Sequence, residues 1–322
     1  MSKAKSELKR MFTEHWNYFA VVSACELQVF DRIYKGQNTL EKLVIENNWN
    51  VKSFGFLMDY LLSENFVSVE ENHYLIVTEK GGLLREENEN GLYYACLNWS
   101  GEHLEAWKNM TFSIQTGLSS FENSHHKPYF DFLNDDKVKL RNYHKAMNQY
   151  ALDVYKNLPT IIDFSIHKSV MDVGGSLGAV IKLIKQSYPD LKCFLFDLES
   201  VLEFVSFTDI VKIQGNFFQE IPNFSDAIIL ARVLHDWDDV KAHSILSNCI
   251  SALPEDGTLY IIENCTDKIN DKLSLLSLNM TVMCQSFERT SKEYIFLCEA
   301  VGFKFIESKK LNELQTILTF KK

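Results

Sequence analysis

His235 is the side chain in this sequence best suited to act as a general base. The pKa of a histidine lies near neutrality, and His235 follows a predicted strand over residues 227–231, at the carboxyl edge of a parallel sheet. Glu263 ends the next predicted strand, residues 258–263, so parallel pairing could bring its carboxylate beside the imidazole. There it would fix the tautomer and stabilise the cation. Such a pair could take a proton from a weakly acidic hydroxyl group.

A glycine-rich turn follows another predicted strand, over residues 168–173, and precedes a predicted helix over residues 179–187. The residues of interest in this turn are Asp172, Gly174, Gly175, Ser176 and Gly178. Glycine lets a ligand approach the backbone, and the first N–H groups of the helix are free to bind it. Asp197 ends the next predicted strand, where a carboxylate can accept from both hydroxyls of a ribose. Tight turns also use glycine, but the turn and Asp197 together favour a ribose-bearing cofactor.

A parallel sheet must bring these side chains to one edge, and the second half of the chain predicts such a sheet. Beyond residue 165, strands alternate with helices and short turns, the pattern of a doubly wound α/β sheet. In addition to the strands named above, a strand is predicted over residues 193–197. Two last strands, over residues 303–307 and 315–320, have a short connection, which makes one edge antiparallel. Asp238 and Asp239 are expected at a helix N-terminus, where they complement its dipole.

The first hundred residues have the order of elements of a winged helix. Apolar residues at spacings of three and four predict a helical stretch over residues 12–34. Thr39 is a candidate N-cap for the next helix, and another helix is expected over residues 51–63. Alternating β-branched residues over residues 66–78 predict a hairpin that turns at residues 71–72.

This winged helix lacks the charge of a DNA-binding module. The helix that would enter the groove has Lys52 as its only cation, against Asp59 and Glu64, and is otherwise mainly apolar. Such a face cannot balance phosphates, but it can pack against protein. The whole chain has 33 Lys and Arg against 43 Asp and Glu, a net charge of −10. We therefore expect this helix to serve packing or dimerisation rather than nucleic-acid binding.

Residues 92–160 are predicted to be helical, with breaks at residues 127–128 and 134–136, and to connect the two halves. No apolar run in the 322 residues approaches the ~18 to 20 that a membrane helix requires. The N-terminus has positive charge without the apolar stretch of a signal peptide. The seven cysteines are widely spaced and never form a C-x-x-C pair, so we expect structural thiols. These features predict a cytoplasmic protein with no membrane partner.

Four motifs occur in the order typical of the class I S-adenosylmethionine (SAM)-dependent small-molecule O-methyltransferases, the family of plant caffeate and flavonoid enzymes and of bacterial enzymes that tailor aromatic polyketides. The chain resembles this family in the turn over residues 172–178, the segment Ala231-Arg-Val-Leu-His-Asp-Trp237, the turn at residues 253–257 with Glu263, and Phe287-Glu-Arg-Thr290. With the winged helix, the resemblance covers nearly the whole chain.

The resemblance implies a Rossmann-like SAM-binding catalytic domain over residues 161–322, an N-terminal winged-helix dimerisation domain over residues 1–100, and a helical connector over residues 101–160 that contributes to the substrate pocket. It implies SAM as cofactor, a homodimer and no metal. The implied catalytic residues are His235 as base with Glu263 and Glu288 beside it. The implied substrate-binding residues are Met147, Asp236, Met280 and Met283. The implied cofactor-binding residues are Asp172, Gly174, Gly175, Ser176, Asp197, Leu198, Asn216, Phe217 and Arg232.

The sequence departs from the family pattern at several positions. Ser176 replaces the third glycine of the turn, and Asn216 replaces an acid that contacts adenine, although an amide can still accept a hydrogen bond. Ala231 replaces the lysine of the plant enzymes. Gln285 and Ser286 replace a pair of glycines, which alters the pocket wall near Glu288.

The sequence therefore predicts a SAM-dependent O-methyltransferase that methylates a phenolic hydroxyl of an aromatic secondary metabolite, such as an anthraquinone. One alternative is a SAM-binding enzyme on the same scaffold that performs hydroxylation, decarboxylation or pericyclic chemistry. The altered residues Gln285 and Ser286 keep that alternative open, whereas His235, Glu263 and Glu288 speak against it. A second alternative is a winged-helix regulator that senses a small molecule.

Overall fold

The computed structural model describes residues 2–70, 73–268 and 270–322, which fall into two compact units. The first unit comprises Met1–Gly101 and Lys145–Gln149. The second comprises Glu102–His144 and Tyr150–Lys322. Helix α11 (Lys137–Val154) therefore contributes residues to both units.

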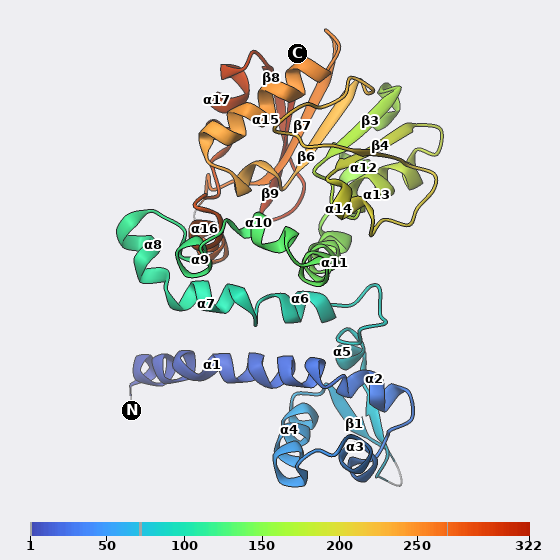
Figure 1. Ribbon diagram of the computed structural model, residues 1–322, viewed down its shortest axis with the longest axis vertical. Coiled ribbons are helices and arrows are strands. Elements are labelled where there is room, and N and C mark those ends of the chain that lie inside the picture. Colours follow the sequence, from blue (N-terminus) through green and yellow to red (C-terminus); the bar gives the residue numbers. More distant parts are fainter. Residues whose placement is uncertain (1, 71–72, 269) are drawn as a thin grey trace. The chain divides into compact units, whose positions relative to one another are not determined.

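The first unit is mainly helical (Figure 1). Its helices are α1 (Lys3–Glu26), α2 (Val29–Tyr34), α3 (Leu40–Asn47), α4 (Val51–Ser63), α5 (Glu79–Gly82) and α6 (Tyr93–Asn98). Thr39 accepts a hydrogen bond from the Lys42 N–H, which confirms it as the N-cap of α3. The buried residues of α4, among them Phe54, Met58 and Leu61, belong to the core of this unit. Through these residues, α4 packs against the core of its own unit.

The helical stretch predicted over residues 12–34 is two helices rather than one. Helix α1 begins earlier, at Lys3, where the Ser2 side chain caps it, and ends at Glu26. Gln28 has a left-handed backbone with φ of 53°, which no helix interior can contain, and α2 begins after it. The periodic apolar pattern continues through this break, which is why the sequence did not reveal it.

The predicted hairpin is confirmed in its two strands. Strands β1 (Val67–Val69) and β2 (Leu75–Val77) are antiparallel, with Ser68 opposite Ile76. Glu71 and Asn72, which the sequence predicted as the turn, lie outside the described residues. The order of three helices followed by a two-stranded wing is thus present.

Short helices make up the first part of the second unit, as predicted. They are α7 (Glu102–Lys108), α8 (Met110–Thr116), α9 (Ser120–His125), α10 (Tyr129–Asn134), most of α11, α12 (Leu158–Ile161) and the 3₁₀ helix η2 (Phe164–Ile166). The predicted breaks are confirmed, because α10 begins after Pro128 and ends before Asp136, which caps α11.

A seven-stranded sheet forms the rest of the second unit (Figure 1), with strand order β5-β4-β3-β6-β7-β9-β8. The strands are β3 (Ser169–Val173), β4 (Lys192–Asp197), β5 (Val211–Gln214), β6 (Ala227–Ala231), β7 (Thr258–Asn264), β8 (Lys304–Lys310) and β9 (Gln315–Lys321). The first five are parallel, whereas β9 is antiparallel to β7 and β8. The antiparallel edge was predicted, but the sequence analysis missed β5. This strand is short, lies at the other edge and is mostly exposed, so it lacks a buried apolar run.

Alternate residues of the central strands face opposite layers, so the sheet is buried on both sides. Leu195 and Ile229 lie in a cluster with helix α13 (Ala179–Ser187). Phe196 and Leu230 lie in another cluster, with α15 (Asp239–Ala252) and α17 (Ser291–Ala300). The remaining helices are α14 (Glu199–Leu202), α16 (Asp271–Cys284) and the 3₁₀ helix η3 (Leu234–Asp236). This arrangement is the predicted doubly wound α/β fold, and it leaves the carboxyl ends of the parallel strands to carry the site.

The cysteines are all free thiols, and five of the seven are buried. Cys249 and Cys298 lie fully inside the core beside α15 and α17, as expected for structural thiols. Among the described residues, no helix combines the length and the apolar character needed to cross a membrane.

Candidate active site

His235 lies on a sharp turn at the carboxyl end of β6. The strand ends at Ala231, and Arg232 has a left-handed backbone with φ of 58°. The Arg232 N–H still donates to the Ile262 carbonyl of β7, at 2.9 Å, so the turn stays attached to the sheet. The 3₁₀ helix η3 follows and carries His235, which is 7% exposed.

Side chains from other segments bind both the N–H groups and the carbonyl groups of the backbone around η3. The Glu263 carboxylate accepts from the N–H groups of Leu234, at 2.9 Å, and His235, at 3.3 Å. The Ser286 hydroxyl lies 2.5 Å from the His235 carbonyl and 3.0 Å from the Trp237 carbonyl. Arg289, fully buried, donates to the carbonyls of Leu234, at 3.0 Å, and Trp237, at 2.7 Å. These contacts fix the orientation of the residue that carries the imidazole.

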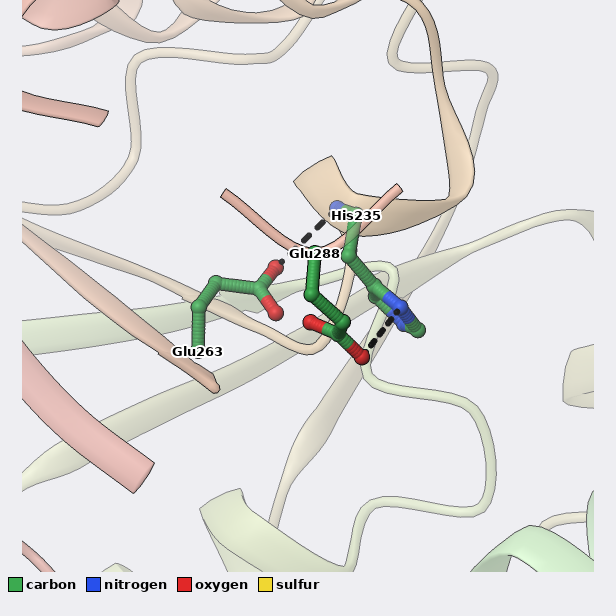
Figure 2. A group of neighbouring side chains, drawn as sticks. All are labelled: His235, Glu263 and Glu288. Carbon is green, nitrogen blue, oxygen red and sulfur yellow. Dashed lines mark hydrogen bonds and ion pairs between the residues drawn. The ribbon is translucent and has the colours of Figure 1, made fainter. Parts of the chain in front are cut away.

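Both ring nitrogens of His235 face acceptor oxygens, of which Figure 2 shows the Glu288 carboxylate. Nδ1 lies 3.5 Å from Oε1 of Glu288. Nε2 lies 3.1 Å from the Arg232 carbonyl oxygen and 3.4 Å from Oδ1 of Asp236. Burial and the Arg232 cation lower the pKa of His235, but the carboxylates of Asp236, Glu263 and Glu288 outweigh them and raise it above its ordinary value. The surroundings thus stabilise the protonated imidazole, which is the form that proton abstraction produces.

Glu263 does not contact the imidazole in the way that strand pairing suggested. One of its oxygens binds the backbone of η3, as described, and the other accepts from Nη1 of Arg232 at 3.1 Å. Of the two glutamates, it is Glu288 whose carboxylate faces the imidazole ring (Figure 2). Glu263 is fully buried at the end of β7, and this burial, partly offset by the nearby cations, raises its pKa.

Glu288 is the charged centre of this group. Arg232 donates to both of its oxygens, at 2.9 and 2.8 Å, and the Asn264 amide donates at 3.1 Å. Burial opposes ionisation of Glu288, but the charges of Arg232 and His235 outweigh it and lower the pKa of the carboxyl. Glu288 is therefore an ionised partner for the imidazole at neutral pH.

One nitrogen of His235 and one oxygen each of Glu263 and Glu288 lie within 4.8 Å of one another, close enough to hold a metal ion. The Arg232 guanidinium already binds both carboxylates. Since a second cation would have to displace this buried guanidinium, the group is better suited to bind Arg232 than a metal.

The glycine turn after β3 forms a tight cradle. Gly174, Ser176 and Gly178 all have left-handed backbones, with φ of 70°, 56° and 77°. A Cβ at Gly175 would lie 2.5 Å from the carboxyl carbon of Asp172, so only glycine fits there. Asp172 is 1% exposed, and neither of its oxygens has a hydrogen-bond partner among the described residues. Burial, with a smaller effect of the Asp197 charge, raises the pKa of Asp172 to about 7.

Asp197 lies beside this cradle at the end of β4. Its oxygens accept from the N–H groups of Ser176, at 2.8 Å, and Leu198, at 2.7 Å. Burial raises the pKa of Asp197 to about 6, although the two backbone hydrogen bonds oppose this shift. Each carboxylate oxygen can accept a further hydrogen bond, as a ribose would require.

Of three other residues predicted to bind the cofactor, Phe217 lies beside the cradle, whereas Asn216 and Arg232 make contacts within the chain. Phe217 adjoins the cradle, because a Cβ at Gly174 would lie 3.3 Å from its ring. The Asn216 side-chain oxygen accepts from the Phe218 N–H at 2.9 Å, so part of its acceptor capacity is used within the chain. Arg232 directs its guanidinium to Glu263 and Glu288. Its predicted contact with the cofactor stays a prediction.

The predicted substrate residues divide between the two units. Met280 and Met283 are buried in α16, which packs against η3. Asp236 follows His235 directly, and its burial raises its pKa. Met147 belongs to the first unit, where it packs against the apolar core.

Sequence analysis gave no role to three residues that prove important here. Ser286 was noted only as a departure from glycine, and Arg289 only as a member of a motif. His144 had no motif, yet its Nδ1 lies 2.6 Å from the Ser176 hydroxyl. Their partners are distant in the sequence, so no local pattern could have paired them. Asp238, by contrast, caps α15 as predicted.

Comparison with known proteins identifies the family. A family profile described as an O-methyltransferase domain matches residues 107–304, more than half of the chain. The chain belongs to the O-methyltransferase family. It is 27% identical over 308 residues to phenazine O-methyltransferase PhzM of Lysobacter antibioticus, which covers 92% of this chain and 90% of that protein.

Solved structures of O-methyltransferases have the same fold. The crystal structure of LaPhzM matches with a TM-score of 0.93 at 25% identity, over 99% of both chains. Human N-acetylserotonin methyltransferase in complex with SAM matches with a TM-score of 0.91 at 22% identity, over 100% of this chain and 98% of that one.

The protein is therefore a SAM-dependent O-methyltransferase of the aromatic natural-product type. Membership in this family makes it an enzyme rather than a regulator. The residues of the second unit fit SAM, because the glycine cradle admits no side chain at Gly175 and Asp172 presents two buried oxygens that have no hydrogen-bond partner in the described part of the chain. A cationic ligand would offset the negative charge of the Asp172 carboxylate.

Proposed function

We propose that this protein methylates a phenolic hydroxyl group of an aromatic secondary metabolite, with His235 as the general base. The observation that carries this proposal is the buried pair of His235 and Glu288, with Nδ1 3.5 Å from the carboxylate. When bound, SAM supplies a methyl group on a positively charged sulfur. A neutral phenol attacks such a carbon poorly, so a base that removes its proton supplies the missing part of the reaction.

In this proposal, the neutral imidazole carries its proton on Nδ1, which faces the Glu288 carboxylate at 3.5 Å, and Nε2 takes the proton of the phenol. Nε2 now faces the Arg232 carbonyl, and the acceptor hydroxyl replaces that carbonyl as its partner. Glu263, Ser286 and Arg289 act on the backbone of η3 and keep the ring directed at the substrate. The proton ends on the imidazole, where the surrounding carboxylates stabilise it, and the oxygen of the phenol keeps the electron pair that forms the new O–C bond. The bond between the methyl group and the sulfur of SAM would break, with its electron pair left on the sulfur of the SAH product.

We infer the aromatic acceptor from the relatives and from the side chains near His235. PhzM is named for phenazine, a flat polycyclic arene. In this chain, the rings of Trp237 and Phe130 contact each other in a tilted arrangement, with 5.4 Å between centroids, and Met280 and Met283 lie on the helix that packs against η3. Aromatic and thioether groups adapt well to flat rings, so a polycyclic polyketide such as an anthraquinone is the acceptor that we propose.

Incubation with SAM labelled in its methyl group and a panel of hydroxyarenes tests this function. The proposal expects label on an acceptor oxygen and its loss when that hydroxyl is blocked beforehand. A product that is hydroxylated, decarboxylated or rearranged without label would instead establish other chemistry on this scaffold. His235→Gln is the matched control, because it keeps a polar side chain but supplies no base.

We further propose that the protein is a homodimer joined through α1. This helix exposes Met11, Phe12 and Trp16, each at least 65% accessible, on one stretch of the first unit. Trp16 also borders an apolar groove of about 570 Å³ between α1 and α4. Because large exposed apolar patches often mark protein–protein interfaces, we propose that a second copy of the chain covers this one. Light scattering should give twice the mass of the chain for the wild type and a smaller mass for Phe12→Asp; a monomeric wild type would overturn the proposal.

A further inference from the structure

Ser176 occupies a strained position in the glycine turn. Its φ of 56° lies in the left-handed region, which is unfavourable for a residue with a Cβ. Gly174 and Gly178 adopt the same region on either side without this cost. The surroundings must therefore hold Ser176 in this conformation.

His144 contacts Ser176 through the serine hydroxyl. Its Nδ1 lies 2.6 Å from the Ser176 hydroxyl, and its ring is 9% exposed. Burial lowers the pKa of His144 to about 4, so the ring is neutral near pH 7 and the contact joins two neutral groups. The Ser176 N–H in turn donates to Asp197 at 2.8 Å. Ser176 thus connects His144 of α11 to the acid at the end of β4, with its hydroxyl bound to the imidazole and its backbone N–H bound to Asp197.

We propose that His144 is a positioning residue for SAM binding: through the Ser176 hydroxyl it holds the turn in the conformation in which the Ser176 N–H orients the Asp197 carboxylate. His144 does not itself touch the cofactor in this proposal. The cost of the strained serine is offset by the hydrogen bond, and the turn is set before the cofactor arrives. The proposal depends on SAM as the cofactor and not on the role of His235.

Calorimetric titration with S-adenosylhomocysteine (SAH), which needs no acceptor, tests this proposal. His144→Leu should weaken SAH binding by about 3- to 10-fold, the effect of one hydrogen bond between neutral groups. His144→Asn should restore most of the affinity, because its amide can reach the place of Nδ1. In turnover, His144→Leu should raise KM for SAM and leave kcat at saturating SAM within about twofold.

His167→Leu is the matched control. His167 is also a partly buried histidine bound to a hydroxyl, that of Tyr260 at 2.8 Å, but it precedes β3 at the opposite end of the strand. Its loss should lower the melting temperature without changing the SAH affinity. Equal loss of affinity in both variants would mean that only general stability is involved, and would overturn the proposal.

Ser176→Ala supplies a second route that does not depend on the folding of the His144 variants. It keeps the strained Cβ but removes the hydroxyl, and should weaken SAH binding as much as His144→Leu. The double variant should be no weaker than either single variant, because both remove the same contact. Additive losses, or an unchanged SAH affinity in His144→Leu, would refute the proposal.

Discussion

Replacing Asp172 by asparagine should make the cofactor-free protein less sensitive to rising pH. The carboxyl is 1% exposed without hydrogen-bond partners among the described residues, and its pKa rises from 3.8 to about 7. Between these values the folded state keeps a proton that the unfolded chain has lost. The stability that this group contributes is therefore complete below pH 3.8 and is lost as the pH rises through 7. The difference corresponds to about 4 kcal/mol, of which about 2.5 kcal/mol falls between pH 5 and pH 8.

Urea unfolding at pH 5 and pH 8 measures this effect. Between these two values, the wild type should lose about 2.5 kcal/mol more unfolding free energy than Asp172→Asn. Asp190→Asn is the control, since Asp190 lies exposed in a turn and its replacement should leave the pH dependence unchanged. The asparagine variant should also bind SAH more weakly, because it loses the buried negative charge. Parallel pH profiles for the wild type and Asp172→Asn would refute the reasoning.

Three further predictions concern the base and its support. His235→Ala should leave SAH affinity nearly unchanged and lower kcat by roughly 10²- to 10⁴-fold, as expected for loss of a general base, and a wild-type rate would exclude the role. Since the carboxylates around His235 raise its pKa above 6.5 and the base must be neutral, kcat/KM of the wild type should rise with pH through a value above 6.5; a flat profile from pH 6 to 9 would contradict this. Ser286→Ala should lower kcat by about 10-fold with little change in KM, as η3 loses its contact at the His235 carbonyl, while the exposed control Ser251→Ala keeps the wild-type kcat.

The fold was largely predictable because its periodic signals are strong. The buried strand at residues 227–231 and the helix at residues 179–187 have the predicted bounds, since an apolar run and a regular amphipathic pattern each specify one element. The break at Gln28 was not predictable, because a left-handed residue leaves the apolar period around it intact. Strand β5 escaped prediction because an exposed edge strand has no continuous apolar run.

The candidate site was predictable only in part, for a different reason. Motifs identified His235, Glu263 and Glu288, and the structure brings the three together. The motifs did not indicate which carboxylate would face the imidazole ring, because that depends on where Arg232 directs its guanidinium. The contact of His144 with Ser176 joins two segments that have no common motif, and only the fold brings them together.

The measurement that tests the role of His235 most directly is a crystal structure of the protein with SAH and an acceptor that it methylates. We expect the oxygen of the acceptor to lie within about 2.6–3.2 Å of the His235 Nε2, with Nδ1 still beside Glu288. An acceptor oxygen bound to a different base, with the imidazole remaining on the Arg232 carbonyl, would contradict the proposed mechanism.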